Sequence, residues 1–255
     1  LLKSKRNFVP KKNIAKEGQK MIETDIPGFP GLVRGVSTRE HGSMPRTTST
    51  SEVKLANRNG LVFHLGFDPA RICQARPRHE TLVSFVEDSS ESVLEADALM
   101  TDVPNRLLTV ATADCHSVFL CTPSRKAVAI IHAGWRGVVR GIVPVAVEFF
   151  RWRYGVKQRE IGALIGPGIQ KCCFEVKNDE NGLTNFVSWP GFISGGNGRH
   201  FVDLAGIVSE QLHRAGVRAV SKSGECTCCS PLGFFSFRRD KNSLRGISFV
   251  GFMES

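Results

Sequence analysis

The stretch of residues 126–155 constrains the fold more than any other part of this 255-residue sequence. A continuous apolar run ends at His132 and predicts a buried strand. A glycine-bounded turn follows, and residues 138–155 then predict a helix despite Pro144. The order strand, loop, helix requires a sheet that carries a helix on one of its faces.

The segments before this stretch also combine strand and helix patterns. We expect an early strand that ends near Ser37 and a helix over residues 51–65, capped by its first residue. Two β-rich runs, 107–112 and 117–122, predict two strands or one interrupted strand. No internal repeat is visible, so these elements are expected to belong to one irregular fold.

The segments after this stretch complete the pattern. Residues 159–169 predict another strand and a tight turn, and an amphipathic helix is then capped by Asp203 and stopped by Gly216. Residues 234–252 alternate apolar and polar side chains around a turn at 240–243, which predicts a C-terminal hairpin. We therefore expect an α+β fold in which mixed β-sheets are layered with helices.

The charge of the sequence is concentrated near its beginning. The chain has 34 basic and 24 acidic side chains, a formal net charge of +10, and residues 1–20 contain seven of the basic and one of the acidic residues. We predict a basic, partly disordered arm over residues 1–25 and a single domain over residues 26–255. Weak binding of the arm to polyanions stays open, but we do not expect a nucleic-acid-binding domain.

The sequence has no feature of a secreted or membrane-spanning protein. No stretch reaches the roughly 20 apolar residues that span a bilayer, and the opening residues lack the apolar core of a secretory signal. We therefore expect a soluble, cytoplasmic protein without a membrane partner. Its eight cysteines are then expected to be core thiols, metal ligands or a nucleophile rather than disulfides.

Three cysteines near the C-terminus form the motif CTCC, which resembles half of a zinc knuckle. A second pair at similar spacing would be needed to complete a site, and Cys172 and Cys173 are adjacent instead. We therefore interpret Cys226, Cys228 and Cys229 as structural thiols.

Cys115 and His132 are the two residues best placed for chemistry. Each lies where an apolar strand gives way to a loop, and strand ends bring side chains from distant segments into one cleft. A thiolate with an imidazole is a favoured pair for zinc. Taken alone, either residue could equally be an inert cysteine or a buried histidine with its hydrogen bonds satisfied.

Together with their neighbours, these residues match a known family. The motifs TADC, HAGWRG, GPGI, CCFEV and FFSFRRD follow one another in order, with Cys115 seventeen positions before His132. This pattern, from about Gly31 to the C-terminus, resembles the multicopper polyphenol oxidase or laccase-domain family. The resemblance implies a cysteine-hydrolase-like α/β/β/α fold. It also implies purine nucleoside phosphorylase activity, although bacterial relatives are also called peptidoglycan editing factors.

The resemblance implies one zinc ion held by His79, Cys115 and His132, which would also be the catalytic residues. His79 is chosen because RHETLV lies in the expected interval before EADA and TADC. A surface histidine is its alternative interpretation. Three ligands of this type leave a fourth position open for water or substrate, as in catalytic zinc sites.

The older family name implies copper, but the residues do not favour it. Multicopper clusters need many imidazoles in closely spaced pairs, whereas this chain has seven histidines and no His-x-His pair. His116 adjoins Cys115 where relatives have an apolar residue. In an extended segment its side chain points to the opposite face, although a supporting role or a fourth ligand position stays open.

Phosphorolysis also needs an anion site, for which arginine is well suited because its planar fork binds two oxygens. The resemblance implies that Arg39 and Arg239 bind substrate. Each could instead be a surface or aspartate-paired arginine, and Arg238 could take the place of Arg239. The Asn-Leu-Gly segment of the family is missing before the first helix, which puts substrate contacts there in doubt.

The resemblance thus implies a zinc-dependent enzyme that cleaves adenosine or inosine with phosphate to free base and ribose 1-phosphate. It also implies adenosine deaminase and methylthioadenosine phosphorylase activities, with nucleoside and phosphate as the partners. One alternative is a cysteine hydrolase or amidase acting on cell-wall peptides, with Cys115 as nucleophile and His132 as base. Others are the historical polyphenol oxidase and a non-catalytic protein that binds a partner through its basic arm.

Overall fold

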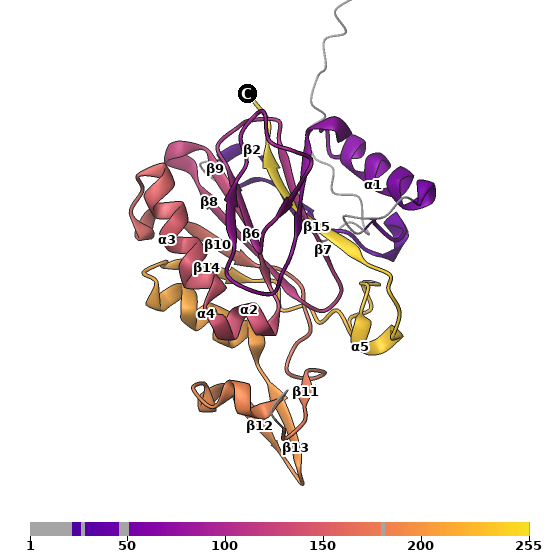
Figure 1. The fold of residues 1–255 in the computed structure, drawn as a ribbon, viewed down its shortest axis with the longest axis vertical. Coiled ribbons are helices and arrows are strands. Elements are labelled where there is room, and N and C mark those ends of the chain that lie inside the picture. Colours follow the sequence, from indigo (N-terminus) through magenta and orange to yellow (C-terminus); the bar gives the residue numbers. More distant parts are fainter. Residues whose placement is uncertain (1–21, 27–28, 46–50, 180–181, 255) are drawn as a thin grey trace, which may run out of the picture.

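The computed structural model describes residues 22–26, 29–45, 51–179 and 182–254, which form four layers (Figure 1). Helix α1 (Glu52–His64) covers the outer face of one sheet. A second sheet packs against the inner face of the first. Three helices cover the second sheet from outside: α2 (Trp135–Arg140), α3 (Ile142–Tyr154) and α4 (Leu204–Arg214). The predicted α+β fold with layered mixed sheets is confirmed.

The first sheet has six strands, and its central strand comes from the end of the chain. In spatial order the strands are β1 (Ile22–Ile26), β2 (Phe29–Val36), β15 (Gly246–Phe252), β7 (Leu107–Thr112), β3 (Ile72–Arg76) and β5 (Val93–Glu95). Strand β15 pairs antiparallel with both β2 and β7. The pairs β7–β3 and β3–β5 are parallel, so the sheet is mixed.

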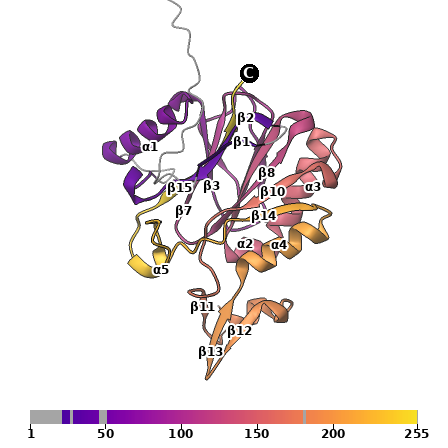
Figure 2. The ribbon, with the colours of Figure 1, turned by 180° about the vertical axis from the view of Figure 1, so that it is seen from behind.

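The second sheet also has six strands and is mixed. Its strands are β14 (Ala219–Lys222), β10 (Gly162–Ile165), β8 (His116–Thr122), β9 (Ala127–Ala133), β6 (Ala98–Thr101) and β4 (Val83–Phe85). A small third sheet contains β11 (Glu175–Val176), β13 (Arg199–Val202) and β12 (Ile193–Gly196). It projects beyond the layered body, as Figure 2 shows from behind.

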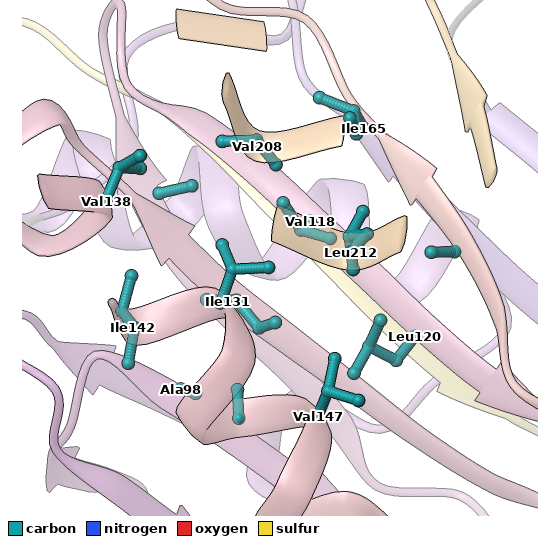
Figure 3. Close-up of a cluster of buried hydrophobic side chains, with 14 of the residues drawn as sticks. Ala98, Val118, Leu120, Ile131, Val138, Ile142, Val147, Ile165, Val208 and Leu212 are labelled. Carbon is teal, nitrogen blue, oxygen red and sulfur yellow. The ribbon is translucent and has the colours of Figure 1, made fainter. Parts of the chain in front are cut away.

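Every residue of β9 is buried, because this strand is covered on both faces. Ile131 points to the helical layer, whereas its neighbour Ile130 points to the space between the sheets. Figure 3 shows Ile131 among side chains of α2, α3 and α4, including Ile142 and Leu212. Burial on both faces explains why the sequence of this strand is continuously apolar rather than alternating.

The predicted helix over residues 138–155 is two helices, and this is a correction. Gly141 has φ 89°, a left-handed conformation that ends α2 and begins α3. Pro144 then lies in the first turn of α3, where a backbone N–H has no partner inside the helix. The glycine, and not the proline, therefore breaks the helix.

The predicted C-terminal hairpin is wrong. The structure has a short helix, α5 (Phe237–Asp240), and the following strand β15 pairs with β2 and β7 instead of folding back. The Ser236 side chain caps α5 by accepting a hydrogen bond from the Arg239 N–H. Alternation of apolar and polar residues predicts a hairpin from local sequence alone. Here the cap at Ser236 favours a helical turn, and β15 pairs with distant strands instead.

The remaining expectations concern the early segments and the loops. The strand before Ser37 and the helix after Ser51 are confirmed as β2 and α1, and the helix α4 begins after its cap Asp203. Of the predicted arm, residues 1–21 lie outside the described residues, and β1 begins at Ile22. No described helix is long and apolar enough to cross a membrane. Short 3-10 helices lie at Arg39–His41, Pro69–Arg71, Pro123–Arg125, Gln158–Glu160, Leu183–Phe186 and Pro190–Phe192.

Candidate metal centre

The structure brings the three predicted metal ligands together. His79 lies in the loop after β3, Cys115 in the turn between β7 and β8, and His132 near the end of β9. One ligand atom from each lies within 4.8 Å of the other two. We call these residues the histidine–cysteine group. Because its members come from three segments of two packed sheets, the fold and not the local sequence assembles it.

Gly134 makes this close approach possible. A Cβ atom at this position would lie 3.0 Å from the Sγ atom of Cys115 and 3.0 Å from Cε1 of His132. It would also lie 3.5 Å from Cδ2 of His79, so a side chain would occupy the space between the three ligands. The first glycine of HAGWRG is therefore required by contact with the group itself.

A buried carboxylate, that of Asp97, fixes the loop that carries His79. Its oxygens accept four backbone hydrogen bonds of 2.7–3.3 Å. The donors are the N–H groups of Arg78, His79, Glu80 and Leu82. The backbone C=O of Asp97 also accepts a hydrogen bond of 2.7 Å from the N–H of His132. One residue therefore positions two of the three ligands.

Asp97 lies outside the motifs that mark the candidate site in the sequence. Its signal is an acid flanked directly by two alanines in VLEADALM, since a buried carboxylate must be satisfied by hydrogen bonds or a cation. The loop needs such support because His79 has φ 61°, which is unfavourable for a residue with a side chain. The Arg140 guanidinium adds a hydrogen bond of 2.9 Å to the carbonyl of His79.

The turn that carries Cys115 is held in the same way by its neighbour Asp114, which has φ 89°. The Asp114 carboxylate accepts hydrogen bonds from the Thr227 hydroxyl at 2.8 Å and from the Arg238 backbone N–H at 2.6 Å. Its carbonyl accepts another from the N–H of Ile169 at 2.8 Å. The turn of Cys115 is therefore fixed by segments that lie up to 124 positions beyond Asp114 along the chain.

The environment of the group disfavours charge in the absence of a cation. Burial, with a smaller contribution from the Asp114 carboxylate, raises the pKa of the Cys115 thiol to about 12. Burial also lowers the pKa of His132 to about 3, with His79 contributing. The Nδ1 atom of His132 is buried with no hydrogen-bond partner among the described residues.

These properties fit a metal site. A divalent cation would turn the buried thiol into a thiolate and would compensate its charge. A set of two imidazoles and one thiolate suits zinc and leaves a fourth tetrahedral position open. The residues of the histidine–cysteine group therefore match the donor set that the sequence predicts.

His116 lies outside the group. It is fully buried, and its Nδ1 atom lies 3.0 Å from the carbonyl oxygen of Gly166. A Cβ atom at Gly168 would lie 2.3 Å from the ring, so the imidazole packs directly against this glycine. Burial lowers the pKa of His116. His116 is therefore a buried packing residue on the other side of its strand.

The two arginines expected to bind substrate meet at one carboxylate, that of Asp240. The Arg39 guanidinium pairs with it, and 47% of the Arg39 side chain remains exposed. Arg239 also pairs with Asp240, at 2.8 Å and 3.0 Å, and the Arg239 guanidinium holds the pKa of this acid well below its usual range.

Arg239 makes further bonds with backbone carbonyls. Its guanidinium donates to the carbonyl oxygens of Thr227, Cys228 and Phe234 at 2.6–3.0 Å. Most of its N–H groups are therefore directed at protein oxygens, whereas Arg39 keeps more of its surface exposed. Arg239 thus lies within α5 and Arg39 pairs with the end of this helix, so the two arginines have different environments.

A cavity of about 780 Å³ lies next to α5 and the third sheet. Its walls include the aromatic rings of Trp135 and Phe174 and the cations Arg238 and Lys241. Trp135 begins α2, three positions after His132. The three members of the histidine–cysteine group are not among its described lining residues, so the cavity adjoins the group through α2 rather than containing it.

Comparisons with known proteins identify relatives of this chain and agree with its fold. The chain is 32% identical over 203 residues to a purine nucleoside phosphorylase of Haemophilus influenzae, across 77% of this chain and 80% of that protein. It is 33% identical over 197 residues to a purine nucleoside phosphorylase of Streptomyces coelicolor, across 76% of this chain and 81% of that one.

A solved structure is similar over almost the whole chain. The crystal structure of YlmD from Geobacillus stearothermophilus matches with a TM-score of 0.82 and 27% identity, over 94% of this chain and 98% of that one. The sequence profile of the family described as multi-copper polyphenol oxidoreductase laccase matches residues 33–253. The sequence match and the layered fold show that this chain belongs to that family.

Proposed function

We propose that this protein is a zinc-dependent purine nucleoside phosphorylase that cleaves adenosine and inosine with phosphate. The observation that carries the proposal is the convergence of His79, Cys115 and His132 in a chain whose relatives are named purine nucleoside phosphorylases. The products would be the free base and ribose 1-phosphate. Nucleoside and phosphate are the only partners that this reaction needs.

The histidine–cysteine group would hold the zinc ion, which supplies Lewis acidity at its open coordination position. The chain itself supplies the positions of the ligands. Asp97 orients the backbone of both histidines, and Asp114 orients the turn of Cys115. Gly134 keeps the space between them free.

The substrate would lie between this group and the neighbouring cavity. The rings of Trp135 and Phe174 offer flat apolar surfaces on which a purine can stack. Arg39 and Arg239 are the proposed substrate-binding arginines, and we assign them unequal parts. Arg39 has the exposed guanidinium that can bind phosphate oxygens, and Arg239 holds Asp240 and thereby positions Arg39.

The same site would support two further activities, adenosine deamination and methylthioadenosine cleavage. Both substrates share the adenine base and the ribose with adenosine, so both would use the same stacking surfaces. Deamination needs no phosphate, so it should continue when phosphate is withheld. This difference separates the two chemistries in one preparation.

A cysteine hydrolase is the second candidate, and the geometry favours it less. A nucleophilic cysteine needs a thiolate that is stabilised by a neighbouring cation. Burial instead raises the pKa of Cys115 and lowers that of His132, so the two would not form an ion pair. The thiol is better suited to a metal than to attack on a carbonyl.

The experiment is a nucleoside panel with and without phosphate, run beside metal analysis. We expect release of free base from adenosine or inosine only with phosphate, and zinc in excess of copper in protein purified without added metal. Cys115→Ala should lose the zinc of the histidine–cysteine group and the activity. Base release that is independent of phosphate would contradict the phosphorylase, and stoichiometric copper would contradict the zinc assignment.

A further inference from the structure

Four of the eight cysteines form a second group, remote from the first in sequence. Cys172 and Cys173 lie in the segment between β10 and β11, and Cys226 and Cys229 lie before α5. Their Sγ atoms all lie within 4.8 Å of one another. We call these residues the four-cysteine group. The pairs are more than 50 positions apart, so only the fold reveals that they meet.

The spacing of the sulfurs matches a single tetrahedral ion. Zinc–sulfur bonds of about 2.3 Å place the sulfurs of a four-thiolate site roughly 3.8 Å apart. Here the Sγ atoms of Cys172 and Cys229 are 3.6 Å apart, and none of the six pairs exceeds the 4.8 Å limit of the group. An iron–sulfur cluster places several atoms between its thiolates and would hold the sulfurs farther apart.

The backbone around Cys226 is arranged to support a thiolate. Cys226 and Cys229 are separated by two residues, the spacing of a metal-binding knuckle. The Gln170 N–H donates to the Sγ atom of Cys226 at 3.5 Å. The N–H groups of Cys228 and Cys229 also interact with this sulfur. Backbone donors of this kind stabilise the negative charge that sulfur carries when it binds a metal.

The two loops are already joined by their backbones. Gly168 and Cys226 form an isolated parallel bridge, and the N–H of Thr227 donates to the carbonyl of Gly168 at 3.1 Å. The side chain of Gln170 adds a hydrogen bond to the carbonyl of Glu225 at 3.3 Å. The sulfurs are therefore held near one another before any ion binds, which lowers the entropic cost of binding.

Positive charge lies close to the group. The Arg238 guanidinium donates to the carbonyl of Cys173 at 3.3 Å, and that of Arg239 donates to the carbonyl of Cys228 at 2.9 Å. Binding of Zn²⁺ by four cysteines releases four thiol protons and leaves a centre with two negative charges. The two arginines are placed to compensate this charge.

We propose that Cys172, Cys173, Cys226 and Cys229 bind one zinc ion through four thiolates. This centre is separate from the histidine–cysteine group and has no open coordination position, so its role is structural. It cross-links the loop after β10 to the loop before α5. Through Thr227 and Arg238, which both bond to Asp114, it stabilises the turn that carries Cys115.

The first test counts zinc in the full-length protein purified without added metal. We expect two zinc ions per chain, and one after the double substitution Cys226→Ser with Cys229→Ser. Cys228→Ser is the matched control, because Cys228 lies in the same loop but outside the group, and it should keep two. Cys115→Ala should keep the one at the four-cysteine group. A single zinc that disappears with Cys115→Ala would refute the proposal and leave the proposed activity intact.

The second test does not depend on the folding of a variant. Cobalt is substituted for zinc in the wild-type protein, and its absorption spectrum is recorded. Four thiolates around tetrahedral cobalt give sulfur-to-metal charge-transfer bands several-fold stronger than those of the single thiolate in the histidine–cysteine group. Charge-transfer bands with the intensity of a single thiolate would overturn the proposal.

Mass spectrometry under non-reducing conditions provides the third test. The freshly purified protein should contain four free thiols in the group once the metal is removed under denaturing conditions. A disulfide between Cys172 and Cys229 in that preparation would overturn the proposal, because it would remove two of the four ligands.

Discussion

The histidine–cysteine group and the four-cysteine group are built on different parts of the fold. The first lies at the ends of strands in two packed sheets, and its His132 is buried. The second lies on two loops outside those sheets, where Cys172 and Cys229 are exposed. A site that keeps one coordination position for substrate needs rigid ligands, whereas a closed site can itself make its loops rigid.

The comparison predicts that the two groups respond separately to mutation. Asp97→Ala should have the largest effect, because it removes the acceptor of four partly buried backbone hydrogen bonds. We expect a loss of about 3 kcal/mol or more in the free energy of unfolding, measured by urea denaturation. Zinc should be lost from the histidine–cysteine group alone. The exposed Asp102→Ala is the control, and equal stability of the two variants would contradict the assigned role of Asp97.

Acid should weaken the region of the histidine–cysteine group in metal-stripped protein. Folded His132 has a pKa of about 3, whereas an unfolded histidine titrates near 6.5. Only the unfolded chain takes up this proton between these values, so the stabilising contribution is complete above pH 6.5 and is lost as the pH falls towards 3. We expect a loss of about 2–3 kcal/mol between pH 7 and pH 4.5 from this residue.

Urea titrations at the two pH values measure this loss. His132→Gln should remove most of the difference, whereas His213→Gln, at an exposed site on α4, should retain it. A pH dependence that is unchanged in His132→Gln would show that the burial of His132 does not control acid stability.

Gly134→Ala should weaken zinc binding by the histidine–cysteine group and leave zinc binding by the four-cysteine group unchanged. Its methyl group would enter the space between Cys115 and His132, so the affinity for the first zinc should fall roughly 10- to 100-fold. Competition with a chelator measures this change, and the four-cysteine group should be unaffected. Gly60→Ala in α1, where a Cβ meets no atom within 4 Å, is the matched control. Unchanged zinc affinity in Gly134→Ala would contradict the fit of the site.

The smallest effects concern the arginines that share Asp240. Arg239→Lys loses hydrogen bonds to three carbonyls, so we expect a fall of about 1–2 kcal/mol in the free energy of unfolding. Arg39→Lys should change stability by less than about 0.5 kcal/mol and should raise the KM for phosphate. Thermal unfolding measures the stability of the two variants, and phosphate titration of the activity measures their KM. If Arg239→Lys alters only the KM for phosphate, Arg239 is itself the phosphate ligand.

Local patterns in the sequence identify the elements whose environment is uniform along their length. Strand β9 is recognised because both of its faces are buried, and α4 because Asp203 caps it and Gly216 ends the turn after it. The C-terminal hairpin fails as a prediction because the pairing of β15 depends on strands far away in sequence. Helix or strand content is thus easier to predict than strand partners.

The residues of the candidate site differ in the same way: some are marked by local sequence motifs, and others are defined only by contacts between distant segments. His79, Cys115 and His132 can be predicted because the family motifs mark their positions in the sequence. Asp97 and the four-cysteine group are missed, because their importance comes from contacts between segments. Adjacent cysteines such as Cys172 and Cys173 do not have the spacing of a knuckle, and only the bridge between Gly168 and Cys226 brings their partners near.

The central position of β15 has a consequence for synthesis on the ribosome. The chain emerges from its N-terminus, so β2 and β7 are complete long before residues 246–252 appear. Until then, the nascent chain has two unpaired strand edges where its first sheet should be continuous. A premature stop codon at position 246 would therefore leave an aggregation-prone product, although every residue of the histidine–cysteine group had been translated.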